Sequence, residues 1–247
     1  IKKVKKEFDK GLPSGTTLSI TAVGNDIWVS DTYLSNIEKS NASIKKTYSV
    51  YDLTGKPGIF RQIFYDSVLH RIWFTTGVGL YYYSLLSGKT TKTIFQVAGS
   101  SSVDYVRNFL RLNNDELLMA RLDGVYRLNN EGNEGHLIRE FGINGINHLC
   151  GLSGNRLALS VIGQPLKIYS YSAGFTLKEE QLIDINNTIM MVSEDVNTGT
   201  IWAATEHGLY KIDNRSYKIL RHFTLDDGMA NDFIYAALPD KHGWIWC

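Results

Sequence analysis

The chain has 247 residues, of which 26 are Lys or Arg and 25 are Asp or Glu, so its net charge is +1. This near-neutral charge argues against a nucleic-acid binder, which usually carries a pronounced basic face. Hydrophobic residues make up 43% of the sequence and charged residues 21%, which is ordinary for a folded domain and excludes a disordered chain. No apolar run approaches the roughly 18 residues that a membrane-spanning helix needs.

A short hydrophobic phrase recurs six times along the chain. Its copies begin at Ile27, Ile72, Leu117, Leu157, Ile201 and Ile245, and they read IWVS, IWFT, LLMA, LALS, IWAA and IWC. The first residues are separated by 45, 45, 40, 44 and 44 positions. This period matches that of four-stranded propeller blades and exceeds the periods of ankyrin and leucine-rich repeats. The sequence therefore predicts a repeat protein.

Each repeat predicts four short strands. The first strand precedes the phrase, at residues 60–66, 106–112, 146–152, 189–195 and 233–240, and the phrase itself is the second strand. The third strand follows a turn, at residues 79–83, 124–128, 164–169 and 208–213, and an outer strand is visible at 91–95 and 217–223. These segments are rich in β-branched and aromatic residues, and no segment has helical periodicity over three turns.

These strands predict an all-β fold, a β-propeller of four-stranded antiparallel blades. The expected blades span residues 16–54, 58–98, 103–141, 145–184 and 188–225, and strands within 1–9 and 232–247 belong to partial blades. The whole chain, 1–247, is then one propeller region with about five complete blades. We expect it to be an excerpt of a larger, seven-bladed propeller.

The search for catalytic and metal-binding patterns returns little. The six histidines are scattered without HExxH or paired His-Cys spacing, so neither a metal site nor a cofactor is expected. Asp66, Asp195 and Asp240 recur at the end of the first strand of different repeats, which is typical of a turn-capping residue rather than a catalyst. The Trp of the repeated phrase is expected to pack between neighbouring blades.

Three segments together resemble a known family. They are Gly-Met-Ala-Asn-Asp-Phe-Ile at 228–234, Asp-Lys-His-Gly-Trp-Ile-Trp at 240–246, and the strand pair Ile-Trp-Ala-Ala-Thr-Glu-His-Gly-Leu-Tyr at 201–210. This pattern resembles the two-component regulator propeller repeat, found in the periplasmic sensor regions of Bacteroides-type hybrid two-component systems. The resemblance covers nearly the whole chain, and it is strong in blades two and five and weak in blade four.

The resemblance implies a function for the region. Family members place two seven-bladed propellers and an immunoglobulin-like domain outside the inner membrane, followed by a histidine kinase, a receiver and a DNA-binding domain. The chain contains none of these cytoplasmic modules, so this region would not itself be an enzyme and would bind no nucleic acid. It would lie in the periplasm, bind a glycan-derived oligosaccharide, act within a homodimer, and signal to polysaccharide-utilisation genes. Segments outside this chain would supply the membrane contact.

The fold predicts where a ligand would bind. In a propeller, the loops from an outer strand to the next inner strand, and from second to third strand, gather on one face. On that face we expect the ligand-binding candidates Asp31, Arg61, Tyr105, Arg107, Arg121, Gln164, Glu206 and His207. The three arginines favour an acidic oligosaccharide over a neutral one, because a guanidinium pairs with carboxylate or sulfate.

Two other classes stay open at this point. A protein-interaction scaffold would use the same fold to bind a peptide or protein. A propeller polysaccharide lyase or glycosidase would need convergent carboxylates or a Tyr-His pair over the channel. The loops of that face offer only Asp31, Asp123 and Glu206, which are too sparse and unpaired to favour catalysis.

Overall fold

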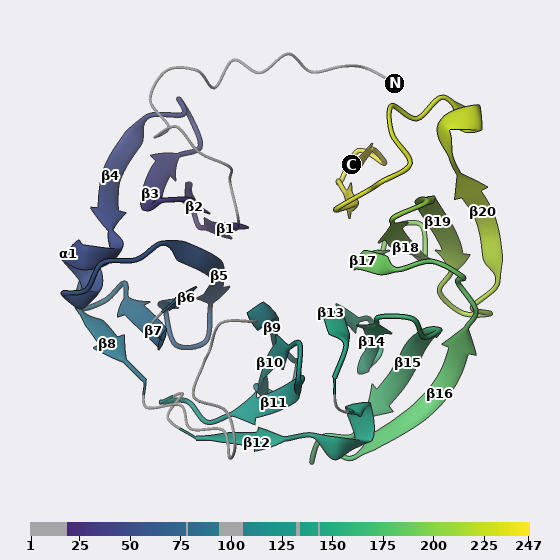
Figure 1. The fold of residues 1–247 in the computed structure, drawn as a ribbon, viewed down its shortest axis with the longest axis horizontal. Coiled ribbons are helices and arrows are strands. Elements are labelled where there is room, and N and C mark those ends of the chain that lie inside the picture. Colours follow the sequence, from purple (N-terminus) through teal and green to yellow (C-terminus); the bar gives the residue numbers. More distant parts are fainter. Residues whose placement is uncertain (1–18, 78, 94–105, 132–133, 143) are drawn as a thin grey trace. The chain divides into compact units, whose positions relative to one another are not determined.

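The computed structural model describes residues 19–77, 79–93, 106–131, 134–142 and 144–247. This part of the chain contains five four-stranded antiparallel sheets, one two-stranded sheet and very little helix, which confirms the predicted all-β fold (Figure 1). Within each four-stranded sheet the strands lie in the order of the sequence. The chain divides into two compact units, and the boundaries between them fall within the strands of the third sheet.

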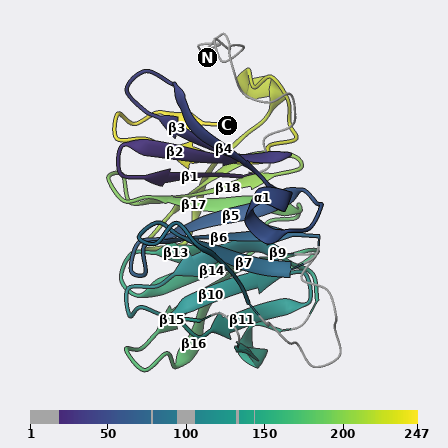
Figure 2. The same ribbon diagram turned by 90° about the vertical axis from the view of Figure 1, so that its left-hand side faces the viewer.

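One unit contains residues up to 108 together with 128–136. Its first sheet consists of β1 (Ser19–Val23), β2 (Asp26–Ser30), β3 (Tyr33–Glu38) and β4 (Ile44–Ser49). The second sheet consists of β5 (Phe60–Asp66), β6 (Arg71–Thr76), β7 (Gly79–Ser84) and β8 (Thr90–Lys92). Between the two sheets the chain forms the short helix α1 (Val50–Thr54), which Figure 2 shows at the end of β4.

The other unit contains residues 109–127 and 137–247. The third sheet consists of β9 (Val106–Arg111), β10 (Leu117–Arg121), β11 (Gly124–Leu128) and β12 (Gly135–Leu137), and a 3-10 turn η1 (Arg139–Phe141) follows. The fourth consists of β13 (Ile146–Leu152), β14 (Arg156–Val161), β15 (Leu166–Tyr171) and β16 (Leu177–Ile183). The fifth consists of β17 (Ile189–Asp195), β18 (Thr200–Thr205), β19 (Gly208–Asp213) and β20 (Ile219–Phe223), before η2 (Leu225–Asp227), β21 (Leu238–Pro239) and β22 (Ile245–Trp246).

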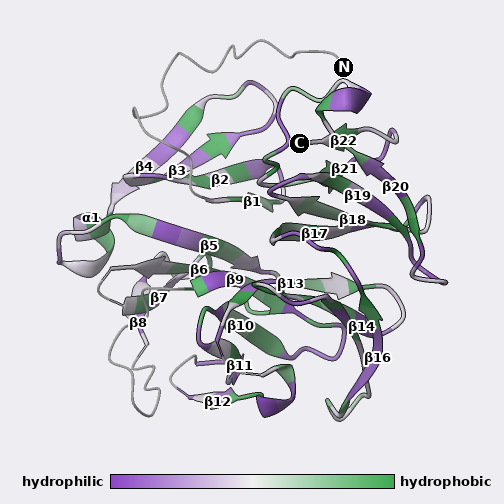
Figure 3. Ribbon diagram, turned by 45° about the vertical axis from the view of Figure 1, so that its right-hand side comes forward, coloured by the Kyte–Doolittle hydropathy of each residue, from purple (hydrophilic) through white to green (hydrophobic). Residues whose placement is uncertain are grey.

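The repeated phrase is the buried second strand of every four-stranded sheet. All six residues of β18 and all five of β10 are buried, whereas β16 and β20 are mostly exposed. Figure 3 shows β10 coloured mainly as hydrophobic. A strand covered on both faces needs a continuous apolar run, which is the pattern that the phrase supplies. The burial of apolar side chains between neighbouring sheets is the main stabilising contribution.

A hydroxyl at the end of the phrase links each of two sheets to the next. Ser30 Oγ donates to the carbonyl of Arg61, at 3.0 Å, and Ser160 Oγ donates to the carbonyl of Ile189, at 2.8 Å. Both serines are fully buried. An unmatched buried hydroxyl costs free energy, so these bonds explain why a small hydroxyl residue ends an otherwise apolar strand.

The recurring aspartates are turn caps, as predicted. Asp66 Oδ1 accepts the backbone N–H groups of Val68 and Leu69, and its Oδ2 accepts Trp73 Nε1–H at 3.2 Å. Asp240 has the same arrangement with Trp246, at 3.0 Å. At these two positions one carboxylate both closes the turn and accepts the indole N–H of the tryptophan in the repeated phrase.

The helix α1 was not predicted from the repeat. Ser49 and Asp52 form a capping box at its start, and Gly55 ends it with a φ of 68°. Such a local cap stabilises a single helical turn without any helical periodicity. The helix buries Val50 in a cluster that also contains Trp28, Tyr48 and Tyr83, so a tryptophan of the phrase packs between the first two sheets.

The strands predicted near the two ends of the chain differ from the others. The first strand predicted at 233–240 is only Leu238–Pro239. Upstream of it, the N–H of Ile234 donates to the carbonyl of Thr205 and the carbonyl of Asp232 accepts from Gly208, so this segment pairs with the end of β18 rather than with a strand of its own sheet. The strand expected within 1–9 lies outside the described residues.

Candidate functional site

Three loops of the second unit surround a pocket of about 320 Å³. Gly163, Gln164 and Pro165 come from the loop between β14 and β15, and Glu206 comes from the turn between β18 and β19. The third loop joins β16 to β17 and contributes residues 184–188, which are Asp184, Ile185, Asn186, Asn187 and Thr188. The pocket therefore lies where the fourth and fifth sheets meet, and its volume is at the lower end of the range for small-molecule sites.

Reciprocal hydrogen bonds hold two of these loops together. The N–H of Glu206 donates to the carbonyl of Thr188, at 3.2 Å, and the N–H of Thr188 donates to Glu206 Oε1, at 3.3 Å. Asn187 Nδ2 donates to the hydroxyl of Tyr210, at 2.8 Å, which fixes the same loop to β19. Because these bonds join the loops to each other and to β19, the pocket is pre-formed, and binding need not order its loops.

The lining has the chemistry of a site for hydroxyl groups. Asp184 and Glu206 supply carboxylate oxygens, which accept hydrogen bonds, while Gln164 and Asn186 supply amides that both donate and accept. Ile185 is buried and forms an apolar part of the wall. Among the described residues that line this pocket there is no Lys, Arg or His. A neutral polyhydroxyl ligand fits this lining better than an anion, which two carboxylates would repel.

Two of the predicted residues meet in this pocket and two others of the same unit do not. Gln164 and Glu206 line it, as described. Arg121 ends β10 with only 3% of its surface exposed, and its guanidinium makes a bidentate ion pair with Asp123, both N···O distances being 2.9 Å. Its charge is thus matched within the protein. The side chain of His207 is exposed beside the pocket, and its carbonyl accepts a hydrogen bond from His222 Nε2.

The other predicted residues belong to the first unit or fall outside the described residues. Asp31 is buried in the turn after β2, where its carboxylate accepts the N–H of Tyr33, so it acts as a turn residue. Arg61 and Arg107 are exposed near the starts of β5 and β9. Tyr105 lies outside the described residues.

Residues 184–188 were missed by the sequence reasoning, although a signal for them was available. They form the loop from an outer strand to the next inner strand, one of the two loop types expected on the binding face. Asn186-Asn187-Thr188 also departs from the repeat, since no other such loop in the chain has two consecutive Asn residues. Packing does not require such a polar run.

Comparisons with known proteins identify the fold. No family model and no curated protein sequence matches the chain. Among solved structures, it is similar to the extracellular domain of BT4673 from B. thetaiotaomicron, a protein assigned as a hybrid two-component system, with 17% identity and a TM-score of 0.73 over 98% of this chain and 33% of that one. It is also similar to PorZ, a surface component of the type-IX secretion system of Porphyromonas gingivalis, with 14% identity and a TM-score of 0.62 over 86% of this chain and 29% of that one.

A third similar structure is a β-propeller by description. It is the β-propeller domain of Cps50 (Swd1) from Myceliophteria thermophila, with 10% identity and a TM-score of 0.64 over 84% of this chain and 73% of that one. The fold is therefore that of a β-propeller, as the sequence predicted. The chain spans about a third of the length of the BT4673 extracellular domain and of the PorZ chain in these structures. Among the residues that the structure describes, no helix is long and apolar enough to cross a membrane.

Proposed function

We propose that this chain belongs to the extracytoplasmic sensor region of a hybrid two-component signalling protein, and that it binds a glycan-derived oligosaccharide. The observation that carries the proposal is the pre-formed pocket around Gln164 and Glu206, whose amides and carboxylates suit sugar hydroxyls. The similarity in fold to the extracellular domain of BT4673 over 98% of this chain supports the sensor part of the proposal.

In this proposal the region is periplasmic and has no catalytic role of its own. Ligand binding changes the arrangement of a homodimer, and a kinase module elsewhere in the protein reads that change to control polysaccharide-utilisation genes. A ligand shifts such an equilibrium only if it binds the two arrangements with different affinity. The pocket lies between loops of two sheets, so a change in their spacing would alter the affinity directly.

The lining also refines the class of glycan. The sequence favoured an acidic oligosaccharide because of three arginines, but this pocket contains Asp184 and Glu206 and no cationic side chain. We therefore expect its ligand to present a neutral sugar unit, with hydroxyls that donate to the two carboxylates.

The test uses the full extracytoplasmic region that contains this chain. Calorimetric titration against a library of neutral and acidic oligosaccharides should give a saturable hit without product formation. Glu206→Gln should weaken that binding about tenfold, because an acceptor oxygen becomes a donor, while the remaining amide oxygen keeps the bond to Thr188. Glu180→Gln, an exposed position on β16 away from the pocket lining, is the matched control and should leave the affinity unchanged.

Other results of this titration would support a different class of protein or a different binding site. Conversion of a glycan to product would show an enzyme. Silence across the library, with capture of a defined protein partner, would show a scaffold. Binding that is insensitive to Glu206→Gln would remove this pocket from the proposal.

A further inference from the structure

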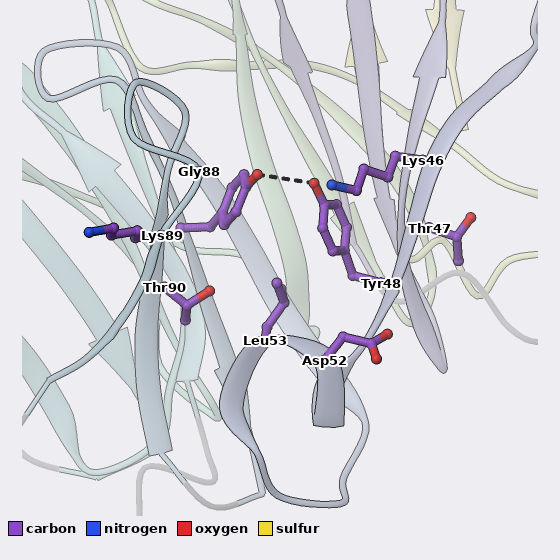
Figure 4. A pocket seen from close by; sticks show the side chains of 9 residues that line it. Lys46, Thr47, Tyr48, Asp52, Leu53, Gly88, Lys89 and Thr90 are labelled. Atoms are coloured by element: carbon purple, nitrogen blue, oxygen red, sulfur yellow. Dashed lines mark hydrogen bonds between the residues drawn. The ribbon is translucent and has the colours of Figure 1, made fainter.

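A second pocket, of about 570 Å³, lies in the first unit between its two sheets. It is formed by β4 and α1 on one side and by the turn from β7 to β8 on the other, as the close view in Figure 4 shows. None of its residues was predicted as a binding residue. Its lining differs in charge from that of the first pocket, because it contains two lysines, Lys46 and Lys89, and a single carboxylate, Asp52.

A pair of tyrosines lies at the base of this second pocket. Tyr48 and Tyr83 come from different sheets, each is only 9% exposed, and their hydroxyl oxygens are 3.0 Å apart. Both rings contact Trp28, with centroids 6.2 and 6.0 Å away, which holds them in place. Burial and the neighbouring Tyr48 raise the pKa of Tyr83, so its hydroxyl stays protonated at neutral pH.

The tyrosine pair has one hydroxyl hydrogen to spare. Each phenol carries one O–H, and one of the two donates to the other. The hydrogen of the accepting tyrosine has no partner among the residues that the structure describes. Since both tyrosines line the pocket, this hydrogen is available to a ligand that accepts a hydrogen bond.

The charges beside the pair favour an anion. The ammonium of Lys46 lies 4.7 Å from the ring centroid of Tyr48 and makes no ion pair with a described residue. Figure 4 shows it close to the hydroxyl end of that ring. Asp52 offsets one of the two lysine charges, and its carboxylate is held at the start of α1 by the N–H of Ser49, at 2.7 Å, a bond that lowers the pKa of Asp52. The lining therefore keeps a net positive charge.

The remaining walls suit a sugar ring better than a bare ion. Leu53 supplies an apolar surface and, in Figure 4, lies between Tyr48 and Thr90, whose hydroxyl both donates and accepts. A pyranose has apolar C–H groups as well as hydroxyls and can therefore use both kinds of wall. Lys89 points away from Tyr48 in Figure 4 and adds positive charge at the rim.

We propose that this second pocket binds an acidic sugar unit, whose carboxylate or sulfate group is held by Lys46 and the spare hydroxyl of the Tyr48–Tyr83 pair. This site is separate from the first pocket, for which we expect a neutral sugar unit. The protein would then recognise a neutral and an acidic sugar unit at two places in its fold.

The test is saturation-transfer NMR on the full extracytoplasmic region with three probes, which are glucuronate, glucose and inorganic sulfate. Glucuronate should bind saturably, and any binding of glucose at the first pocket should not change in Lys46→Gln. Lys46→Gln should raise the Kd for glucuronate about tenfold, because a charge-assisted contact is lost. The double variant Tyr48→Phe/Tyr83→Phe keeps both rings and removes both hydroxyls, and it should weaken binding in the same direction.

Matched controls separate this site from charge effects and from the first pocket. Lys45→Gln removes the same charge from the neighbouring residue of β4, which pairs with Asp26 at 2.7 Å and does not belong to the pocket lining. It should leave glucuronate binding unchanged, and so should Glu206→Gln. Melting temperatures of all variants check that each one folds.

The outcomes decide the proposal. Competition between sulfate and glucuronate supports an anion site, and Lys46-dependent binding of glucuronate without such competition supports a site that also needs the sugar. An unchanged Kd for glucuronate in Lys46→Gln, an equal loss of glucose and glucuronate binding in that variant, or no binding of either anion would overturn it.

Discussion

The capping aspartates allow a sharp comparison of two equivalent positions. Asp66 and Asp195 both end a first strand and both are buried. The carboxylate of Asp66 accepts the indole N–H of Trp73 as well as two backbone N–H groups. The carboxylate of Asp195 also accepts two backbone N–H groups, but its other partner is the hydroxyl of Thr198, at 2.5 Å.

We expect the substitution by Asn to cost more at position 66 than at position 195. An amide has one acceptor oxygen and one NH₂ group. In Asp66→Asn the oxygen serves the turn, the NH₂ group faces the indole donor, and a buried N–H is left unmatched, which costs about 2 kcal/mol. In Asp195→Asn the NH₂ group donates to Thr198, whose hydroxyl turns its own hydrogen to Thr200, 2.8 Å away. That loss should stay below about 1 kcal/mol.

Calorimetric melting of both variants checks the difference. For a chain of this size, about 2 kcal/mol corresponds to a fall in Tm of roughly 4–8 °C, and the Asp195 variant should fall by no more than about half of that. Because the two positions lie in different units, amide hydrogen exchange in β5–β6 and in β17–β18 reports each effect locally. Equal losses at the two sites would refute the reasoning that the indole donor makes the difference.

Two further predictions concern stability. At Gly208, where φ is +100°, an added Cβ would lie 2.3 Å from the carbonyl oxygen of Phe223, so Gly208→Ala should cost about 2–4 kcal/mol in urea unfolding. Gly199→Ala, at a φ of +65° with open space around it, should cost only about 1 kcal/mol, and a loss as large as that of Gly208→Ala would contradict the clash. Burial lowers the pKa of His148 to about 4, and its Nδ1 accepts the N–H of Val192 at 3.3 Å. The unfolded chain takes up this proton near pH 6.5 and the folded chain only near pH 4, so the protein should lose up to about 3 kcal/mol as the pH falls through that window. His148→Gln should flatten that part of the stability curve measured by urea titration, and an unchanged curve would show that the histidine is not the group responsible.

The sequence alone determined the repeat and the sheets. The 40–45-residue spacing of the apolar phrase fixed which segments are buried second strands, because only a strand covered on both faces uses such a run. It also predicted the capping role of Asp66, since a residue that returns with the period serves the repeated architecture. Gln164 and Glu206 were candidates because they lie in loops expected on the binding face, and both line the first pocket.

Only the tertiary structure decided what those loops build. Whether Arg121 offers its charge to a ligand depended on Asp123, which pairs with it and buries it. The Tyr48–Tyr83 contact joins two sheets across 35 positions of sequence, and neither residue belongs to a binding motif. The physical reason is that periodic burial specifies strands, whereas a pocket depends on aperiodic loop conformations and on side-chain partners that come together only when neighbouring sheets pack.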